Sequence, residues 1–191
     1  SASGHMIIDV GGGTAEIAVI SLGGIVSWGS VRIGGNRFDA SIAEHIRRKY
    51  GLAIGEQRSE EVKIVVGSAM FMDKPLTMEV CGRDMISGLP KTIIVTSDDV
   101  TEALQHDLHQ LIEAIKEVLH KTPPELSADV MDKGIVMSGG SSLLRNLDEL
   151  IADATGVPCY VADEPLLCVA KGTGIALENL ESYKRSILST K

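Results

Sequence analysis

The hydrophobic period changes along this chain of 191 residues, and these changes limit the folds that it can adopt. Short apolar or alternating runs are typical of β-strands, and they lie at residues 6–10, 16–20, 25–33, 134–137 and 157–161. Glycine-rich turns separate the first three, whereas helix-period segments at 142–154 and 165–180 follow the last two. A meander followed by alternating strands and helices predicts an α/β fold with one mixed sheet and flanking helices.

Two further helices are indicated by apolar residues that recur at every third or fourth position. The first run starts at Phe38, with Asn36 as the predicted N-cap and Gly51 as the residue that ends the helix. The second run is longer, begins at Thr96 with acidic residues in its first turn, and ends before Pro123. These helices are expected to pack on the sheet.

Between the two helices, residues 52–96 contain only short predicted elements, which turn-rich stretches separate. We predict a short polar helix around 56–61 and strands near 62–66, 77–80 and 92–95. A stretch of about 45 residues with such short elements is too small for an independent core. We therefore interpret it as a small α+β subdomain inserted into the larger one.

Charge and cysteine content exclude several classes of function. The sequence carries 18 basic and 26 acidic side chains, and this net charge of −8 disfavours nucleic acid as a partner. The cysteines Cys81, Cys159 and Cys168 are widely spaced, so we expect no disulfide framework, no zinc site and a cytoplasmic setting. We interpret residues 1–6 as a cloning remnant.

The sharpest motif runs from Asp9 to Thr14 and contains three consecutive glycines. Glycines allow backbone amides to approach an anion closely, so Gly12, Gly13 and Thr14 are candidate phosphate contacts. Asp9 is a candidate ligand of Mg²⁺ through water, because this ion favours one or two carboxylates and several waters. The alternative is an ordinary glycine-rich β-turn without a ligand.

A second motif lies at residues 134–144, where an apolar strand runs into Gly139 and Gly140 before a helix. Free amides at such a helix start can bind a ligand above the strand end. The alternative is a plain connection in which Ser141 or Ser142 caps the helix. Neither motif has the spacing of a Walker A loop or of a Rossmann fingerprint.

Together, the two motifs resemble the second phosphate loop and the adenosine loop of the actin, sugar-kinase and chaperone ATPase superfamily. The finer match is to the MreB family of bacterial actin homologues, which the sequence resembles from residue 6 to about residue 180. The matching segments lie at 8–14, 20–26, 47–52, 54–56, 60–64, 67–69, 82–84, 88–92, 122–126, 134–144 and 172–174. This resemblance implies an actin-like ATPase fold of the ribonuclease H-like type, with ATP and Mg²⁺ as cofactors.

The family's ATP contacts fall on three segments of this sequence: Gly12, Gly13 and Thr14; Glu60, Glu61, Val62 and Lys63; and Gly140, Ser141, Ser142 and Leu143. Without the resemblance, the segment around Lys63 reads as the solvated end of a helix. The family's adenosine loop usually has a third glycine where this chain has Ser141. The added Cβ atom either weakens nucleotide binding modestly or leaves it unchanged.

The superfamily clamps its nucleotide between two related domains, yet this sequence contains one phosphate hairpin. It therefore resembles only the C-terminal half of the family, with subdomain IIA at 7–51 and 97–191 and subdomain IIB at 52–96. The parent chain is expected to be a slow ATPase, with Asp9 and Thr14 in supporting catalytic roles. The chain alone is expected to bind nucleotide weakly and not to hydrolyse it.

The resemblance also implies a cellular role and partners. The parent is expected to polymerise into ATP-dependent filaments that determine cell shape and guide cell-wall synthesis. Its filaments would be cytoplasmic and membrane-associated, with membrane contact through the missing half and a RodZ-type membrane partner on subdomain IIA. A different class of function is a protein-interaction module. Alternative families that share the loops are FtsA-like proteins, sugar kinases and chaperone ATPases.

Overall fold

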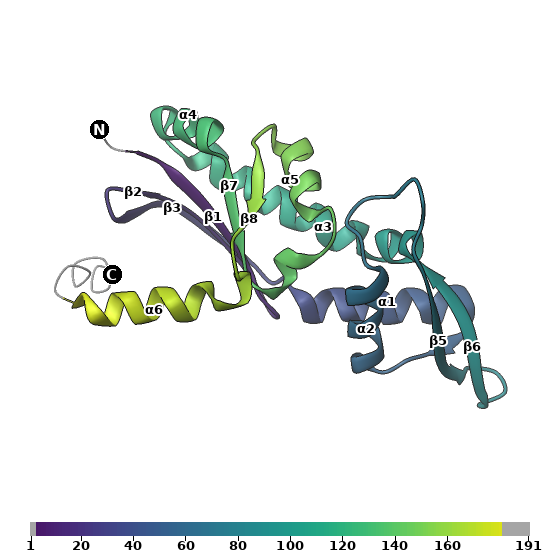
Figure 1. Cartoon of the computed structure of the whole chain (residues 1–191). Helices are drawn as coiled ribbons and strands as arrows, with labels where there is room; N and C mark the ends of the chain where they lie inside the picture. Colours follow the sequence, from purple (N-terminus) through teal and green to yellow (C-terminus); the bar gives the residue numbers. More distant parts are fainter. Residues whose placement is uncertain (1–2, 181–191) are drawn as a thin grey trace.

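The computed structural model describes residues 3–180 and is elongated, with a large sheet at one end and a small sheet at the other (Figure 1). The strands are β1 (His5–Val10), β2 (Ala15–Ser21), β3 (Gly24–Val31), β4 (Leu52–Ala53), β5 (Thr77–Asp84), β6 (Pro90–Thr96), β7 (Ile135–Ser138) and β8 (Cys159–Val161). The α-helices are α1 (Gly35–Tyr50), α2 (Glu56–Val66), α3 (Ser97–Lys121), α4 (Pro124–Lys133), α5 (Leu147–Thr155) and α6 (Cys168–Glu178). Two short 3₁₀ helices are η1 (Gly140–Leu143) and η2 (Pro165–Leu167).

The large sheet has five strands in the order β3-β2-β1-β7-β8. β1 pairs antiparallel with β2, which pairs antiparallel with β3, whereas β1, β7 and β8 run parallel. The prediction of a mixed α/β sheet with flanking helices is therefore confirmed. Its central strand, β1, begins at His5, one residue before the strand predicted from the sequence.

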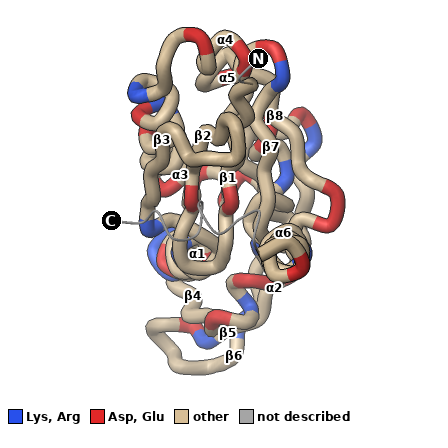
Figure 2. The backbone as a smooth tube through the Cα atoms, turned by 90° about the vertical axis from the view of Figure 1, so that its left-hand side faces the viewer, with Lys and Arg blue, Asp and Glu red and all other residues tan. Residues whose placement is uncertain are grey.

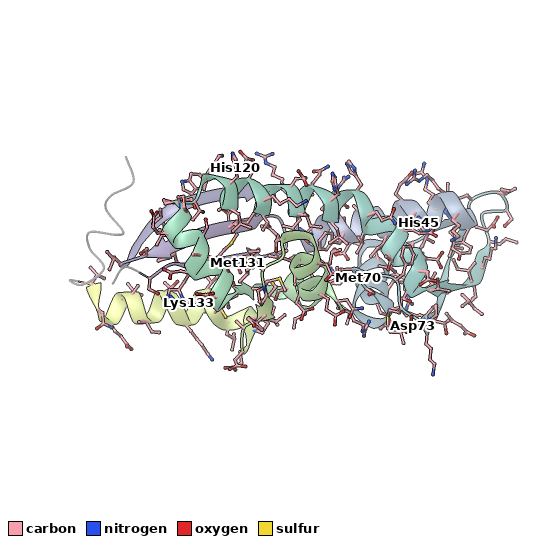
Figure 3. All side chains as sticks on the ribbon, turned by 90° about the horizontal axis from the view of Figure 1, so that it is seen from above. His45, Met70, Asp73, His120, Met131 and Lys133 are labelled. Carbon is pink, nitrogen blue, oxygen red and sulfur yellow. The ribbon has the colours of Figure 1, made fainter. Side chains whose placement is uncertain are left out.

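One face of this sheet forms the core, because alternate residues of β1, such as Met6 and Ile8, are fully buried. Buried residues of α3, α4 and α5 belong to the same apolar cluster. The opposite face is partly exposed. Its central row crosses all five strands in register and consists of Trp28, Ala18, Ile7, Val136 and Tyr160. The helix α6 buries none of its residues and runs along the side of the molecule away from α3 (Figure 3).

The small sheet has the order β4-β5-β6 and is antiparallel. Together with α2 it lies between α1 and α3 in the sequence, and α2 packs against α1 and β5. The helix α3 connects this end of the molecule to the large sheet (Figure 1). Its start is well specified, because Thr96 and Asp99 form the reciprocal hydrogen bonds of a capping box.

Some local predictions were wrong. Residues 62–66, predicted as a strand, form the last turns of α2. Ser59, Val62 and Val66 are buried and three or four positions apart, so packing of this helix face overrides the β-preference of the valines. Asn36 is not the N-cap of α1, because the helix begins at Gly35, two residues earlier than predicted, and Gly34 occupies the cap.

Two helix boundaries also differ from the prediction. Pro123 does stop α3, but Pro124 begins α4, a helix that was not predicted from the sequence. Proline is tolerated in a first helical turn, where its missing amide hydrogen is not needed. The helix predicted at 142–154 is divided into η1 and α5 by Asn146, which has a left-handed backbone conformation with φ of 60°.

Candidate functional site

The glycine turn at residues 11–14 joins β1 to β2 and receives the first turn of α1. Its carbonyl oxygens at Gly11 and Gly12 accept hydrogen bonds from the amides of Gly35 and Asn36, over 3.0 and 2.8 Å. A Cβ atom at Gly34 would lie 2.6 Å from the Gly11 oxygen and 2.7 Å from the Gly12 oxygen. The close approach of the turn to α1 therefore requires glycine at position 34.

The loop after β7 approaches the same turn from the other side. The Ser141 hydroxyl donates a hydrogen bond of 2.8 Å to the Gly11 carbonyl oxygen. Gly139 has a φ of +84°, and a Cβ atom there would lie 2.3 Å from the Val10 oxygen. The resemblance implies that both motifs bind one nucleotide, and the structure brings them into direct contact.

A cavity of about 650 Å³ lies where the glycine turn, the start of α1, α2 and η1 meet. Several of the predicted binding residues line this cavity: Gly12, Glu60, Lys63, Gly140, Ser141 and Leu143. They come from three segments that are far apart in the sequence. The structure therefore brings these three predicted segments together around one cavity.

The other predicted residues lie elsewhere. Gly13 and Thr14 are exposed at the tip of the turn and do not belong to the cavity wall. Glu61 forms an exposed ion pair with Arg58. Two side chains are buried away from the cavity: Val62 is in the apolar core, and the hydroxyl of Ser142 donates to the Gly139 oxygen within its own loop.

Lys63 is held by an acidic partner on α1. Its Nζ atom lies 2.9 Å from Oδ1 and 3.1 Å from Oδ2 of Asp39, and it donates to the Gly35 oxygen over 3.4 Å. Burial raises the pKa of the Asp39 carboxyl above its ordinary value, and the hydrogen bond and charge of Lys63 oppose that rise. This pair places one cation and its counter-charge on the cavity wall.

Sequence reasoning missed other residues of the cavity wall, among them Gly35, Asp39, Gly67, Leu144, Arg145 and Leu166. The consecutive glycines at 34 and 35, directly before a helix, were a usable signal for a close backbone contact. Arg145 donates to the Gly67 oxygen over 2.8 Å and so links the end of α2 to the loop after η1. No local sequence pattern predicts that contact.

Asp9 was predicted as a water-mediated Mg²⁺ ligand. Its Oδ1 atom accepts a hydrogen bond of 2.7 Å from the Ser138 hydroxyl, and Asp9 is half-buried at the carboxyl end of β1. A single fixed carboxylate fits an ion that takes its remaining ligands from water and phosphate oxygens. Asp9 does not, however, line the cavity.

Within residues 3–180, one group of three potential metal ligands occurs, formed by His45, Asp99 and Glu102 on α1 and α3. The Lys49 ammonium already lies 2.7 Å from Asp99 Oδ1 and 3.4 Å from Glu102 Oε2. His45 lies near the small-sheet end of the molecule (Figure 3). This group is therefore a charge network at a distance from the glycine turn.

Basic and acidic residues are mixed along the described part of the chain (Figure 2). Lys and Arg positions are scattered among Asp and Glu positions along the described chain, with no continuous basic stripe (Figure 2). Among residues 3–180, no helix has the length and apolar character needed to cross a lipid bilayer.

The mixed sheet and the convergence of its hairpin turn with the loop after β7 define an actin-like α/β protein. Solved structures agree, because the fold matches the MamK double helical filament with a TM-score of 0.77 at 22% identity, over 91% of this chain and 54% of that one. The fold also matches MreB 5 of Spiroplasma citri bound to AMPPNP, with a TM-score of 0.90 at 38% identity. That match covers 97% of this chain and 56% of the other.

The sequence relationship identifies the family. Residues 1–185 match the MreB/Mbl protein family, and the chain belongs to it. The chain is 46% identical over 186 residues to the cell shape-determining protein Mbl of Bacillus cereus, covering 97% of this chain and 56% of that protein. It is 45% identical over 188 residues to the cell shape-determining protein MreB of Escherichia coli, covering 98% and 54%. The chain thus spans about half the length of these relatives.

Proposed function

We propose that this chain is the nucleotide-binding C-terminal half of an actin-like protein that polymerises into ATP-dependent, cell shape-determining filaments. The observation that carries the proposal is the convergence of the glycine turn, Lys63 and η1 on one cavity. Two solved structures of one relative, MreB 5 of Spiroplasma citri bound to AMPPNP and to ADP, support a nucleotide as the ligand. ATP with Mg²⁺ is the proposed cofactor pair.

In this proposal the cavity holds the adenosine part of ATP, between Lys63 and the η1 loop. Gly12, Gly13 and Thr14 would hold the phosphates, and Asp9 would hold Mg²⁺ through water. Asp9 and Thr14 support the placement of metal and water in the longer protein. The exposure of Gly13 and Thr14 leaves the phosphate side open to solvent, so the chain alone should bind weakly and should not turn ATP over.

We further propose the division into subdomain IIA, at 7–51 and 97–191, and subdomain IIB, at 52–96. Residues 1–2 and 181–191 lie outside the described residues. The longer protein would be cytoplasmic, with membrane contact through its other half and a RodZ-type partner on subdomain IIA. The filament-forming relative MamK supports self-association as part of this role.

Calorimetric titration with ATP·Mg²⁺ tests the nucleotide proposal. We expect a dissociation constant weaker than about 1 μM and no steady release of phosphate. Lys63→Met should weaken binding about five- to tenfold, because it removes the cation from the cavity wall, whereas Lys116→Met on the exposed face of α3 should not. Absence of any binding, or equal effects of the two variants, would contradict the proposal.

A specific observation also favours a protein-interaction module. The turn between β5 and β6 exposes Met85, Ile86 and Leu89, with Ile86 97% exposed. Apolar side chains gathered at an exposed tip are typical of protein contacts. This tip lies in the proposed subdomain IIB, so it favours a filament contact, and light scattering after size exclusion over a range of protein concentrations tests it. A monomer at every concentration would count against this contact, and the same measurement with a RodZ-type partner tests docking on subdomain IIA.

A further inference from the structure

Ser141 is the side chain that joins the two cavity loops inside the cavity itself. Its hydroxyl donates over 2.8 Å to the Gly11 oxygen, 130 positions away in the sequence, and Ser141 is only 8% exposed. The same Gly11 oxygen accepts the Gly35 amide at the start of α1. One carbonyl group therefore connects the glycine turn to both α1 and η1.

The neighbouring serine shows that this contact is a property of position 141. The hydroxyl of Ser142 donates to the Gly139 oxygen, only three positions earlier, and so stabilises its own loop. Ser141 instead bonds the glycine turn at the cavity wall, and an added Cβ atom at Gly35 would lie 3.0 Å from the Ser141 Oγ atom and 3.2 Å from Lys63 Nζ. The hydroxyl and the ammonium thus flank the same backbone position.

We propose that Ser141 is a positioning residue, which fixes the separation of the glycine turn and the η1 loop so that one ligand can contact both. The inference rests on the proposed function, because ATP is such a ligand: its phosphates would contact the turn and its adenosine the η1 loop. Holding both loops in place before binding lowers the ordering cost of the complex. A ligand that contacts only one loop gains less from this bond.

The difference between two-loop and one-loop ligands gives the test. Ser141→Ala should weaken binding of ATP·Mg²⁺ about fivefold, as expected for the loss of one neutral hydrogen bond, and should weaken binding of adenosine clearly less. Ser141→Thr, which retains a hydroxyl, should restore most of the ATP affinity. The control is Ser127→Ala on α4, which removes a hydroxyl outside the cavity and should change neither affinity.

An equal loss for ATP and adenosine would overturn the proposal, since Ser141 would then act only within the η1 loop. Unchanged ATP affinity in Ser141→Ala would overturn it as well. Both results differ from failure of the proposed function, in which the unaltered chain itself binds no ATP.

A second measurement needs no nucleotide. The Gly11 amide donates to the Thr14 oxygen within the turn, so its hydrogen exchange reports how well the turn is held. In the ligand-free protein, the hydrogen of the Gly11 amide should exchange several-fold faster in Ser141→Ala than in the unaltered chain or in Ser127→Ala. If all three proteins exchange it at the same rate, Ser141 does not hold the turn and the inference fails, whatever the nucleotide affinity.

Discussion

The Ser138 hydroxyl donates a hydrogen bond of 2.7 Å to Asp9 Oδ1, and so joins the carboxyl ends of two adjacent parallel strands, β1 and β7. Ser138 is buried, and its acceptor is a carboxylate oxygen. We expect Ser138→Ala to lower the free energy of unfolding by about 1–3 kcal/mol, the usual contribution of a hydrogen bond to a charged group. Urea unfolding followed by circular dichroism measures this change.

A matched control lies two strands away on the same sheet. Ser30 donates over 2.7 Å to Glu16, but this pair is exposed. Ser30→Ala should cost less than about 0.5 kcal/mol, because water replaces the lost partner. Equal losses in the two variants would show that the Asp9 carboxylate is not specially stabilised by Ser138.

The ion pair between Lys63 and Asp39 predicts a pH dependence. Burial raises the pKa of Asp39 and Lys63 opposes the rise, so Lys63→Met should raise this pKa further. At pH 7.5 the variant keeps a buried, unpaired carboxylate, and we expect a loss of about 1–3 kcal/mol in the free energy of unfolding. As the pH falls through the raised pKa, Asp39 takes up a proton and the loss should shrink.

Chemical unfolding at pH 7.5 and pH 5 checks this sign. The double variant Lys63→Met, Asp39→Asn is the control, since it has no carboxylate at position 39. Its loss in the free energy of unfolding should therefore vary little with pH. A loss in the single variant that is the same at both pH values would contradict the prediction.

Periodicity predicted the elements that pack most regularly. The long helix α3 and its cap at Thr96 follow directly from apolar spacing and acidic first-turn residues, and the meander follows from short runs between glycines. Periodicity failed at residues 62–66, where β-branched residues lie in a helix because Val62 and Val66 fill the core. Local preference is weaker than burial at such positions.

The cavity could be predicted only in part, for a related reason. The glycine turn and the residues from 140 to 143 have recognisable local chemistry, but Asp39 and Arg145 matter through partners far away in the sequence. Val62 and Ser142 were included because they lie between binding residues, and helix and loop geometry turns their side chains inward. Such orientations depend on the packed structure.

Asp99 links the cap of α3 to α1 and should make the protein sensitive to acid. Burial opposes its ionisation, but hydrogen bonds from Lys49, from Thr96 and from Tyr50 outweigh burial and lower the pKa of Asp99. Because the folded-state pKa is lowered, this stabilisation is present above the unfolded value of about 3.9 and is lost as the pH falls through the folded value. Asp99→Asn should cost about 2–4 kcal/mol at pH 7.

Unfolding measured from pH 7 down to pH 3 tests this expectation, because the difference between the unaltered chain and Asp99→Asn should shrink below about pH 4. The neighbouring Asp98 is the control: its Oδ1 atom has no hydrogen-bond partner, and Asp98→Asn should change stability by less than about 1 kcal/mol. A difference that is independent of pH would contradict the assignment.

The three cysteines should differ in reactivity. Burial raises the pKa of the Cys159 thiol to about 12, whereas Cys81 is exposed and Cys168 is half-buried. Because the thiolate is the reactive form, a thiol reagent at pH 8 should modify Cys81 and Cys168 in the folded protein and Cys159 only after unfolding. Mass spectrometry of the labelled peptides measures the order, and rapid native labelling of Cys159 would contradict it. Cys159→Ala should leave the number of labels per folded chain unchanged.

Two glycines at helix N-caps offer a test of the close contact between the glycine turn and α1. Gly34 caps α1 and Gly55 caps α2, but a Cβ atom at Gly34 would lie 2.6 Å from the Gly11 oxygen, whereas one at Gly55 meets nothing within 4 Å. Both alanine variants lose the same cap preference, worth about 0.5–1 kcal/mol. Gly34→Ala should cost about 2–3 kcal/mol more than Gly55→Ala, because backbone atoms on both sides must move.

Since that movement displaces Gly11 and Gly12 from the cavity wall, Gly34→Ala should also weaken ATP binding. Urea unfolding and titration of the two variants side by side decide the matter, and equal stabilities would mean that the turn and α1 are not in tight contact.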